Sequence, residues 1–323
     1  MFSSKILYTG RYVPEKFVKN DDISKIVDTS DEWISSRTGI KNRYISDGDN
    51  TSDIAAKTAL NILSKGNINA LDIELIIVAT VSSDYSTPST ACLVQAKIGA
   101  KNAVAFDITA ACSGFVYALS VADKFIKSGV YRNVLVIGAE VLSKILDWED
   151  RTTCVLFGDG GAGVFIERSD NGGILTEDLG SDGQKGMSLT GSYIAPSNAF
   201  NSIKKLPLSY LEMDGRAIFQ FATRQIPQSI ENIIKKSGIR LEEIKYVIPH
   251  QANSRIIESI SKKTGINIKK FYLNMENYGN TSSASIPIAL DEMVEKGMII
   301  RGDKILFTGF GGGLTWGSIL VEW

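Results

Sequence analysis

Short apolar runs rich in β-branched residues alternate along the chain with longer stretches whose apolar positions recur every three or four residues. The short runs predict strands, most clearly at residues 75–79, 104–108, 134–138, 245–248 and 304–307. The longer stretches, for example residues 53–64 and 226–236, predict amphipathic helices. Strands alternating with helices indicate an α/β fold, which we expect to contain largely parallel sheets.

Two of these patterns recur in the same order further along the chain. A helix end, a turn and a strand follow one another in residues 62–78 and again in residues 233–248. An apolar run leading into glycines occurs in residues 155–163 and again in residues 305–313. Such an internal repeat predicts two related halves, 1–170 and 171–323.

Composition narrows the class of protein. With 323 residues, 44% hydrophobic and 22% charged, the chain can bury a large core as one domain or two intimate half-domains. A net charge of −1 provides no overall field for nucleic acid or an anionic membrane, so we expect neither partner. We find no signal peptide and no apolar run of transmembrane length, and therefore expect a cytoplasmic protein.

The cysteines do not form a recognisable framework. Cys92, Cys112 and Cys154 are odd in number and widely spaced, which argues against disulfides. With a single histidine and no Cys-x-x-Cys pair, we expect no metal site. Cys92 lies in a helical pattern and Cys154 in an expected strand at 154–157, and both are interpreted as core residues.

Cys112 stands in a different context. An expected strand runs through small residues to Cys112, and an apolar helix follows, so a tight strand-to-helix turn is predicted. The N–H groups and dipole at a helix start favour a thiolate, the form that nucleophilic catalysis needs. The backbone N–H of the cysteine could also serve as an oxyanion donor. A buried structural cysteine is the alternative, and this segment alone leaves both interpretations open.

Three polar or glycine-rich segments also follow or precede the expected elements. His250 comes just after the strand at 245–248, at the edge of an α/β sheet where sites form. Asn280 lies in a polar loop before a helix, where a turn or cap role is the ordinary interpretation. The glycines of Phe310-Gly-Gly-Gly313 let backbone N–H groups approach a ligand, and a tight turn between strands is the alternative.

Taken together, these segments resemble the β-ketoacyl-acyl-carrier-protein synthase III family of thiolase-fold condensing enzymes. The matching motifs are Asp28-Thr-Ser-Asp-Glu-Trp-Ile34, Arg37-Thr-Gly-Ile40, Ala111-Cys-Ser-Gly114, Leu156-Phe-Gly-Asp-Gly160, His250-Gln-Ala-Asn253, Gly279-Asn-Thr-Ser282 and Gly311-Gly-Gly-Leu-Thr-Trp-Gly-Ser318. They span nearly the whole chain. The resemblance implies a five-layer αβαβα fold of two duplicated halves and a homodimer. It also implies a decarboxylating condensation of an acyl-CoA primer with malonyl-acyl-carrier protein, which initiates fatty acid synthesis without a further cofactor.

The resemblance also implies roles for individual residues. It assigns the catalytic triad to Cys112, His250 and Asn280, and the oxyanion hole to the N–H groups of Cys112 and Gly312. The adenine and phosphate end of coenzyme A falls to Thr29, Trp33, Arg37 and Arg151. The pantetheine tunnel falls to Gly215, Phe219 and Asn253, and a basic patch for the carrier protein falls to Arg255, Lys262 and Lys263.

One position departs from several relatives. Thr87 stands where they carry a phenylalanine that reaches across the dimer and closes the acyl pocket. Our hypothesis is that the smaller Thr87 admits primers bulkier than acetyl. Thr152 and Cys154 also replace smaller residues common in the family, and the sequence gives neither a role.

Two other functions fit the same residues. A related acyltransferase of specialised metabolism would use Cys112 to make an ester, amide, quinolone or polyketide. A non-catalytic carrier-protein or coenzyme A scaffold on the same fold is the second, since fold does not dictate function. A thiolase or hydroxymethylglutaryl synthase fits less well, because a thiolase usually has a second catalytic cysteine and no convincing candidate is found.

Overall fold

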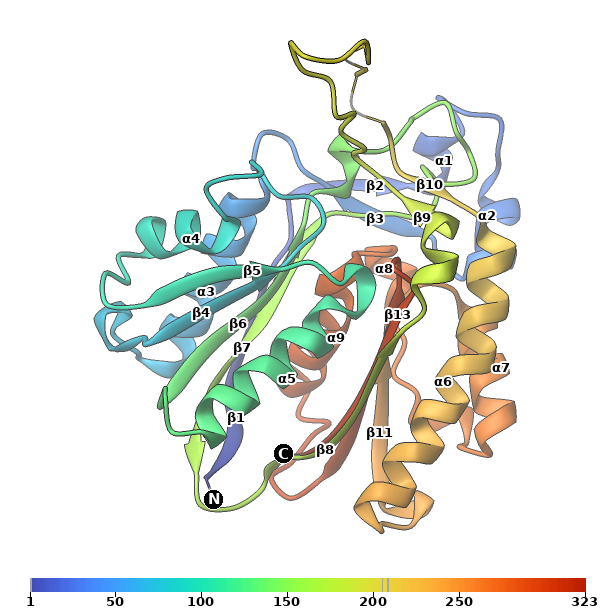
Figure 1. Ribbon diagram of the computed structural model, residues 1–323. Helices are drawn as coiled ribbons and strands as arrows, with labels where there is room; N and C mark the ends of the chain where they lie inside the picture. Colours follow the sequence, from blue (N-terminus) through green and yellow to red (C-terminus); the bar gives the residue numbers. More distant parts are fainter. Residues whose placement is uncertain (1, 205, 208) are drawn as a thin grey trace.

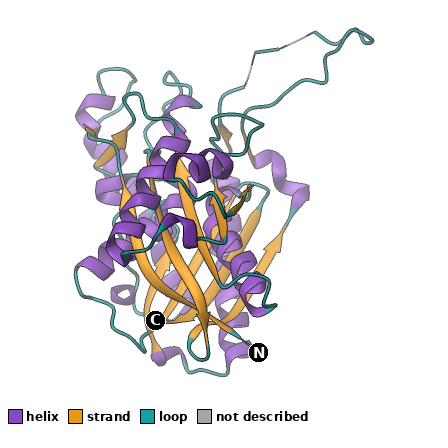
Figure 2. Cartoon of the chain, turned by 90° about the vertical axis from the view of Figure 1, so that its left-hand side faces the viewer, coloured by secondary structure: helices purple, strands orange, loops and turns teal. Residues whose placement is uncertain are grey.

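The computed structural model describes residues 2–204, 206–207 and 209–323. Two β-sheets lie face to face, with helices between them and helices on both outer faces (Figures 1 and 2).

The first sheet is built from the N-terminal part of the chain in the order β1-β7-β6-β4-β5. Strand β4 pairs in parallel with β5 and β6, whereas β7 pairs antiparallel with β6 and β1. The bounds are β1 Ser3–Tyr12, β4 Leu75–Ala79, β5 Val104–Ile108, β6 Asn133–Glu140 and β7 Gly160–Ser169.

The second sheet comes from the C-terminal part in the order β11-β12-β13-β8. Strands β11 and β12 are parallel, and the β12–β13 and β13–β8 pairs are antiparallel. The bounds are β8 Gly173–Ser181, β11 Ile244–Pro249, β12 Lys304–Gly311 and β13 Thr315–Glu322. This order and these directions repeat those of β4-β6-β7-β1, and a single parallel bridge from Val247 to Phe271 stands where β5 stands in the first sheet.

The prediction of largely parallel sheets is therefore wrong. Four of the seven strand pairings in the two large sheets are antiparallel. Strands β12 and β13 show the physical reason, because only residues 312–314 join them. So short a connection permits antiparallel pairing alone, since parallel strands need a long crossover.

The helices complete five layers. The central layer holds α5 (Gly114–Lys127) and α9 (Ser285–Glu295), and their residues Phe115 and Leu290 share one buried cluster with strands of both sheets. On one outer face α3 (Thr51–Gly66) and α4 (Thr90–Ile98) pack on the first sheet. On the other outer face α6 (Gly215–Ser237) and α7 (Ser254–Thr264) pack on the second. The αβαβα fold expected from the resemblance is confirmed.

The remaining elements are short. They are β2 Lys16–Lys19, β3 Asn42–Ile45, β9 Leu189–Thr190, β10 Glu212–Met213, α1 Asn20–Ile23, α2 Asp31–Thr38 and α8 Met275–Tyr278. The 3-10 turns among the described residues are η1 Ala70–Asp72, η2 Ala111–Ser113, η3 Leu142–Lys144, η4 Gly183–Ser188, η5 Leu241–Glu243, η6 Ile268–Lys270 and η7 Ser282–Ala284. Within the described part of the chain, none of the helices combines the length and the apolar character needed to cross a bilayer.

Capping residues decide where the long helices begin. Asn50 and Asp53 form a capping box at the start of α3. Helix α6 begins at Gly215, well before the predicted residue 226, because the Asp214 side chain accepts from the N–H groups of Arg216 and Ala217. The additional turns of α6 carry Gly215 and Phe219.

Two expectations about cysteine environments are wrong. Residues 154–157 form a turn rather than a strand, since the N–H of Cys154 bonds back to Asp150 O at 3.0 Å. Only Phe157 makes a bridge, with Asn280. Cys154 itself is buried as expected, whereas Cys92 lies in α4 but is exposed. Its Sγ lies 3.6 Å from Ala105 O of β5, the edge strand of the first sheet.

Candidate active site

A cavity of about 510 Å³ is lined by Cys112, His250, Asn280 and Gly312 together. Each comes from a different segment: η2, the end of β11, the loop before η7, and the turn between β12 and β13. The volume lies in the range typical of small-molecule sites. The residues that the sequence analysis singled out thus meet at one place, although they are far apart in the chain.

Cys112 is placed by a tight turn between β5 and α5. Ala111, directly before it, has φ +46°, a left-handed conformation that non-glycine residues seldom adopt. The cysteine side chain is buried, and α5 begins two residues later at Gly114. Its thiol therefore lies near the start of α5 and lines the cavity.

The charge state of Cys112 differs from our expectation. Burial raises the pKa of its thiol to about 12, because a thiolate with 7% exposure loses most of its hydration. The helix start was expected to favour the thiolate, and desolvation works in the opposite direction. Burial therefore favours the neutral thiol of Cys112 at neutral pH.

The end of β12 packs directly against Cys112. A Cβ atom on Gly311 would lie 2.7 Å from Cys112 N and 3.0 Å from Cys112 Cβ, distances that ordinary side chains do not reach. A glycine is required here for close backbone approach. As a result the backbone at Gly311 and Gly312 lies beside the backbone of Cys112 on the cavity wall.

His250 is fixed on several sides. Its backbone N–H donates to Thr308 O at 2.7 Å, and its ring meets the Phe310 ring edge to face with centroids 5.2 Å apart. Its Nδ1 lies 2.7 Å from Ser285 Oγ. Burial lowers the pKa of His250 to about 3, so the imidazole is neutral at neutral pH.

Asn280 is held through its backbone and its side chain. Its N–H donates to Leu156 O at 2.9 Å, and its own carbonyl accepts from Gly158 N at 3.1 Å. Its side-chain Oδ1 accepts from Ser282 N at 2.9 Å. Because the oxygen is occupied in this way, the Nδ2 amide is the group left to donate into the cavity.

The same cavity extends to the residues expected to line a pantetheine tunnel. Gly215 and Phe219 from the first turns of α6 lie on its wall, as does Asn253, whose side chain caps α7 by accepting from Arg255 N at 2.9 Å. Thr152, for which the sequence gave no role, also lines it. The cavity thus has an apolar wall on the α6 side and a polar end at Cys112.

The residues expected at the coenzyme A nucleotide end form a separate cluster. The Trp33 ring lies 4.4 Å from the guanidinium carbon of Arg37 and 5.2 Å from that of Arg151. Arg151 also donates to Asp28 O at 2.9 Å. Thr29 directly follows Asp28 in the sequence, and its buried Oγ1 has no hydrogen-bond partner among the described residues. None of the four lines the cavity.

The expected carrier-protein patch lies on α7. Arg255, Lys262 and Lys263 are all exposed. Arg255 donates to Ser36 O at 2.9 Å, and Lys263 donates to Thr223 O at 2.8 Å. Three exposed cations thus lie on one short helix, and two of them also bond a backbone carbonyl. This arrangement fits a docking patch and equally fits an ordinary solvated helix face.

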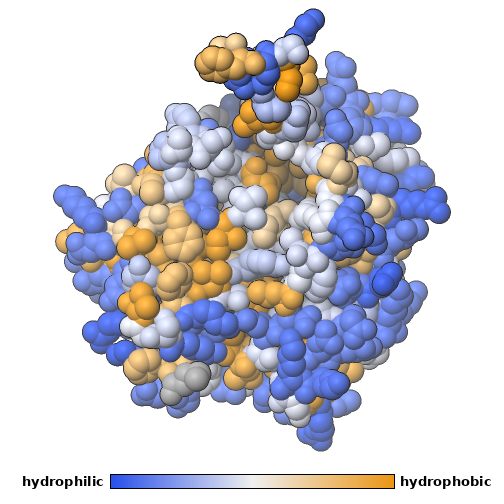
Figure 3. Space-filling model, viewed as in Figure 1, coloured by the Kyte–Doolittle hydropathy of each residue, from blue (hydrophilic) through white to orange (hydrophobic). Residues whose placement is uncertain are grey.

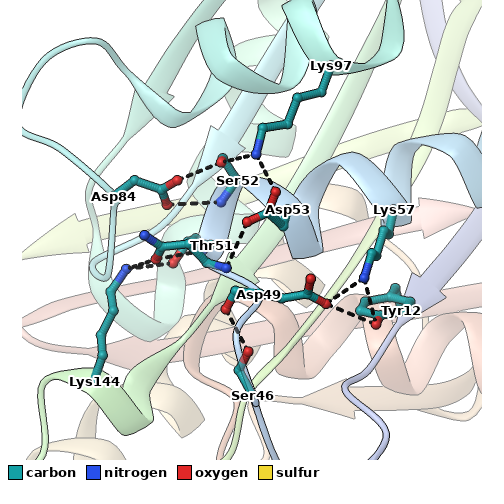
Figure 4. Close-up of polar contacts among 11 residues, drawn as sticks. Tyr12, Ser46, Asp49, Thr51, Ser52, Asp53, Lys57, Asp84, Lys97 and Lys144 are labelled. Atoms are coloured by element: carbon teal, nitrogen blue, oxygen red, sulfur yellow. Dashed lines mark hydrogen bonds and ion pairs between the residues drawn. The ribbon is translucent and has the colours of Figure 1, made fainter.

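Thr87 is exposed and does not line the cavity of its own chain. The segment just before it is anchored to the start of α3 (Figure 4) and, through Ser83, to η3. Asp84 accepts from Ser52 N at 3.0 Å. Lys144 donates to Ser83 O at 3.2 Å. Two hydrogen bonds therefore hold the start of the surface segment that leads to Thr87.

Sequence reasoning missed two groups beside the site. Ser285 contacts the His250 ring, and Glu140, fully buried at the end of β6, accepts from Ser82 Oγ at 2.6 Å and Ser283 Oγ at 2.9 Å. Ser283 and Ser285 lie in the same polar segment as Asn280, and this position in the sequence could have indicated them. Glu140 follows an apolar strand and carried no signal. In residues 2–204, 206–207 and 209–323 no group of three or more His, Cys, Asp or Glu side chains could hold a metal ion.

A five-layer αβαβα fold with a cysteine-lined cavity at the strand ends defines a thiolase-fold condensing enzyme. The family model for 3-oxoacyl-[acyl-carrier-protein (ACP)] synthase III matches residues 106–183, and the model of its C-terminal part matches residues 234–323. The chain belongs to this family.

Relatives that match over the full length of the chain belong to the same family. Proteins named beta-ketoacyl-[acyl-carrier-protein] synthase III from Clostridium acetobutylicum and Streptococcus mutans are 55% and 54% identical to this chain, over 100% of it and over 99% and 100% of their own lengths. The crystal structure of 3-oxoacyl-[acyl-carrier-protein] synthase III from Aquifex aeolicus VF5 has a TM-score of 0.92 and 47% identity, and covers 99% of this chain and 100% of that one. The protein is thus an acyltransferase-type condensing enzyme of fatty acid synthesis.

Proposed function

We propose that this protein condenses an acyl-coenzyme A primer with malonyl-acyl-carrier protein, releasing carbon dioxide and coenzyme A. The product is a β-ketoacyl-acyl-carrier protein, the first intermediate of fatty acid synthesis. One observation carries the residue-level mechanism: a thiol, a neutral imidazole, a carboxamide and a glycine-rich strand end line one cavity.

The first step is transfer of the acyl group to Cys112. Its sulfur attacks the thioester carbonyl while the N–H groups of Cys112 and Gly312 stabilise the oxyanion. The carbon–sulfur bond to coenzyme A breaks, and the proton lost by Cys112 leaves with the coenzyme A thiol. Because the thiol and the imidazole are both neutral at rest, the start of α5 supplies the stabilisation for negative charge developing on sulfur.

The second step begins with decarboxylation of the malonyl unit. The carboxylate leaves as carbon dioxide, and its electron pair becomes an enolate whose oxygen accepts hydrogen bonds from His250 and Asn280. The enolate carbon then attacks the acyl carbonyl on Cys112. The sulfur leaves as a thiolate and takes up a proton, which restores the resting enzyme.

The remaining residues would hold the two substrates. Trp33, Arg37 and Arg151 offer an indole face and guanidinium groups for adenine and phosphate, with Thr29 beside them. Gly215, Phe219 and Asn253 would line the pantetheine arm that joins this end to Cys112.

The carrier protein would dock on Arg255, Lys262 and Lys263, because an acidic carrier favours a local cationic patch on a chain with little net charge. The chemistry needs only polarised carbonyls and an enolate, so we propose no cofactor beyond the thioester substrates. We also propose the cytoplasm as its location.

Mass spectrometry of the intact protein tests the first step. Incubation with a panel of acyl-coenzyme A thioesters should add one acyl group to the wild-type chain and none to Cys112→Ala. The variant has a built-in control, because it retains the exposed thiol of Cys92 and the buried thiol of Cys154. Acyl mass on Cys112→Ala, or none on the wild type, would contradict the proposal and favour a non-catalytic scaffold.

Carbon dioxide release from malonyl-acyl-carrier protein tests the second step. We expect release by the wild type and a fall of ~10²-fold or more in His250→Ala and Asn280→Ala, since each loses one enolate donor. An acylated Cys112 without any release would favour the acyltransferase of specialised metabolism. The comparisons do not favour that alternative, because a polyketide priming ketosynthase matches at 31% identity and the fatty-acid relatives above match at 54% and 55%.

We propose that the enzyme is a homodimer joined through β5. This strand is the edge of the first sheet, and Val104 at its start is 50% exposed. Figure 3 shows apolar side chains gathered on the face where β5 and α5 lie, and Phe106 of β5 contacts Phe125 of α5 with centroids 6.3 Å apart. An exposed apolar edge strand is a template for pairing with a second copy.

We propose, further, that Thr87 reaches the acyl pocket of the partner and admits bulky primers. Replacing it with phenylalanine (Thr87→Phe) should reduce turnover of longer primers relative to acetyl-coenzyme A by roughly tenfold or more, because the larger ring fills the pocket. Turnover of acyl-coenzyme A thioesters of increasing length measures this. A strict acetyl preference of the wild type would refute the hypothesis.

A further inference from the structure

The hydrogen bond between His250 and Ser285 determines which ring nitrogen carries the proton. Ser285 is the first residue of α9 and is buried, and its Oγ lies 2.7 Å from His250 Nδ1. The imidazole is neutral, so Nδ1 either donates to Ser285 or accepts from it. The distance alone does not distinguish these two tautomers.

A count of the donors around Ser285 distinguishes them. The backbone N–H of Gln251 points to Ser285 Oγ at 3.4 Å and can only donate, so the serine oxygen already accepts one hydrogen bond. Among the described residues, the only acceptor within hydrogen-bond reach of the serine hydroxyl is His250 Nδ1. If Nδ1 carried the proton, this buried hydroxyl would have no acceptor, an arrangement that folded proteins avoid.

We infer that Ser285 is a positioning residue that donates to His250 Nδ1 and thereby holds the histidine proton on Nε2. Two neighbours stabilise the arrangement. The Phe310 ring fixes the plane of the imidazole, with an interplanar angle of 72°. Gln251 fixes the segment that follows His250, since its side chain donates to Pro249 O at 2.8 Å and accepts from Asn274 N at 3.0 Å.

The consequence for the reaction rests on the proposed function. A histidine with its proton on Nε2 has no free electron pair facing the cavity, so it cannot take the proton of Cys112. It can donate a hydrogen bond to an oxygen that becomes negative, as the enolate oxygen does. His250 would then act beside the Asn280 amide, whose orientation is fixed in the same way by Ser282 N. Ser285 should therefore matter for decarboxylation and not for acylation of Cys112.

Nitrogen-15 NMR of the imidazole tests the inference directly. The chain contains a single histidine, so a sample labelled at histidine gives one pair of ring signals without assignment. At neutral pH we expect a protonated Nε2 and a hydrogen-bonded, unprotonated Nδ1 in the wild type. A protonated Nδ1, or a charged ring, would overturn the inference whatever the activity of the enzyme.

Variants separate the positioning role from a structural one. Ser285→Ala should give a mixture of tautomers and a carbon dioxide release lowered roughly tenfold, with acylation of Cys112 changed less than about twofold. Ser285→Thr keeps the hydroxyl and should restore both the spectrum and the rate. Ser229→Ala is the matched control, since it removes a different buried hydroxyl, one that donates to Ser318 Oγ at 2.9 Å.

An unchanged spectrum in Ser285→Ala would contradict the inference. If Ser285→Ala does not fold, the spectra of the wild type and of Ser285→Thr still decide. If the wild type does not condense the substrates but its spectrum shows the Nε2 tautomer, the proposed function fails and the assignment to Ser285 stands.

Discussion

At the scale of single residues, the site consists of buried uncharged groups whose orientation is fixed by neighbours. Burial keeps Cys112 as a thiol and His250 as a neutral ring. The Ser285 hydroxyl orients the His250 ring, and the Ser282 N–H orients the Asn280 amide, so that each presents a donor to the cavity. Such preorganised dipoles stabilise developing charge without the reorganisation that water would need.

The buried histidine predicts a pH dependence of stability. Its pKa is about 3 in the folded chain and 6.5 in a model peptide, so below the latter value the unfolded chain binds a proton that the folded chain does not. Stability from this group is present above that pH and is lost as the pH falls. Between about pH 7.5 and about pH 5.5 the wild type should lose ~1.4 kcal/mol more unfolding free energy than His250→Gln.

Urea unfolding of both proteins at the two pH values measures this difference. The carboxylates titrate equally in both chains and cancel. Equal losses in the two proteins would show that the folded histidine has an ordinary pKa.

A second prediction concerns Gly311. In Gly311→Ala the new Cβ would overlap Cys112 N, so either the end of β12 or the cysteine turn must move. The oxyanion donors would then be displaced, and loss of one such donor costs ~10²-fold in rate. We expect acylation of Cys112, followed by mass spectrometry, to slow by about that factor. Gly183→Ala, where an added Cβ meets no atom within 4 Å, should react at the wild-type rate.

The sequence indicated which residues line the cavity, but not the electrostatic environment of their side chains. Cys112 and His250 stand at the ends of apolar runs, where strand and turn patterns are legible. The sequence showed the helix start that favours the Cys112 thiolate but not the burial that raises the pKa of the thiol, because a local motif does not show how completely other segments cover it. Ser285 was missed because its contact joins positions 35 residues apart.

At the scale of elements, caps and buried ion pairs determine how the helices are placed. The sequence identified the cores of α3 and α6 but placed both helix starts too late, since a polar cap breaks the apolar period. The turn at 154–157 was mistaken for a strand because its residues are apolar and, apart from Leu156, buried. Burial and strand structure produce the same pattern over so short a run.

Asp291 of α9 illustrates a connection that only the structure reveals. Its buried carboxylate forms ion pairs with Arg11 of β1 and with Lys65 of α3, the latter at 2.8 Å, and accepts from Thr9 Oγ1 at 2.7 Å. Asp291→Ala leaves two partly buried cations with less compensation. We expect it to lower the unfolding free energy by about 2 kcal/mol in urea denaturation.

The control lies in the same network. Glu295 pairs with Arg11 and Lys65 but is 45% exposed, so Glu295→Ala should cost less than ~1 kcal/mol. Equal losses in the two variants would indicate that burial of Asp291 adds nothing to its ion pairs.

At the scale of the whole molecule, the site depends on both parts of the chain. Cys112 comes from the part that forms the first sheet, and His250, Asn280 and Gly312 come from the part that forms the second. The matching strand orders support the division that the sequence repeat predicts at residue 170, and we propose that a duplication produced it. A cavity between two such parts needs their relative position to be held firmly, as the shared central helices do.

The edge strand β5 is the element through which we propose that two copies pair. If β5 pairs with its copy, placing a lysine at the exposed edge position Val104 should prevent association, since edge charges block strand pairing. Sedimentation velocity should then show a dimer for the wild type and a monomer for Val104→Lys. Ile300→Lys is the matched control, because Ile300 is equally apolar, 66% exposed and lies in the turn before β12.

The same variant tests whether dimer formation determines the preference for acyl-chain length. A monomeric Val104→Lys chain would lack the Thr87 of a partner, so its acyl pocket would lose one wall while Cys112 and His250 stayed in place. We expect it to accept acyl chains with less discrimination by length than the wild type, measured on the same coenzyme A panel. A monomeric variant with wild-type selectivity would place Thr87 outside the acyl pocket, and a dimeric Val104→Lys would move the interface away from β5.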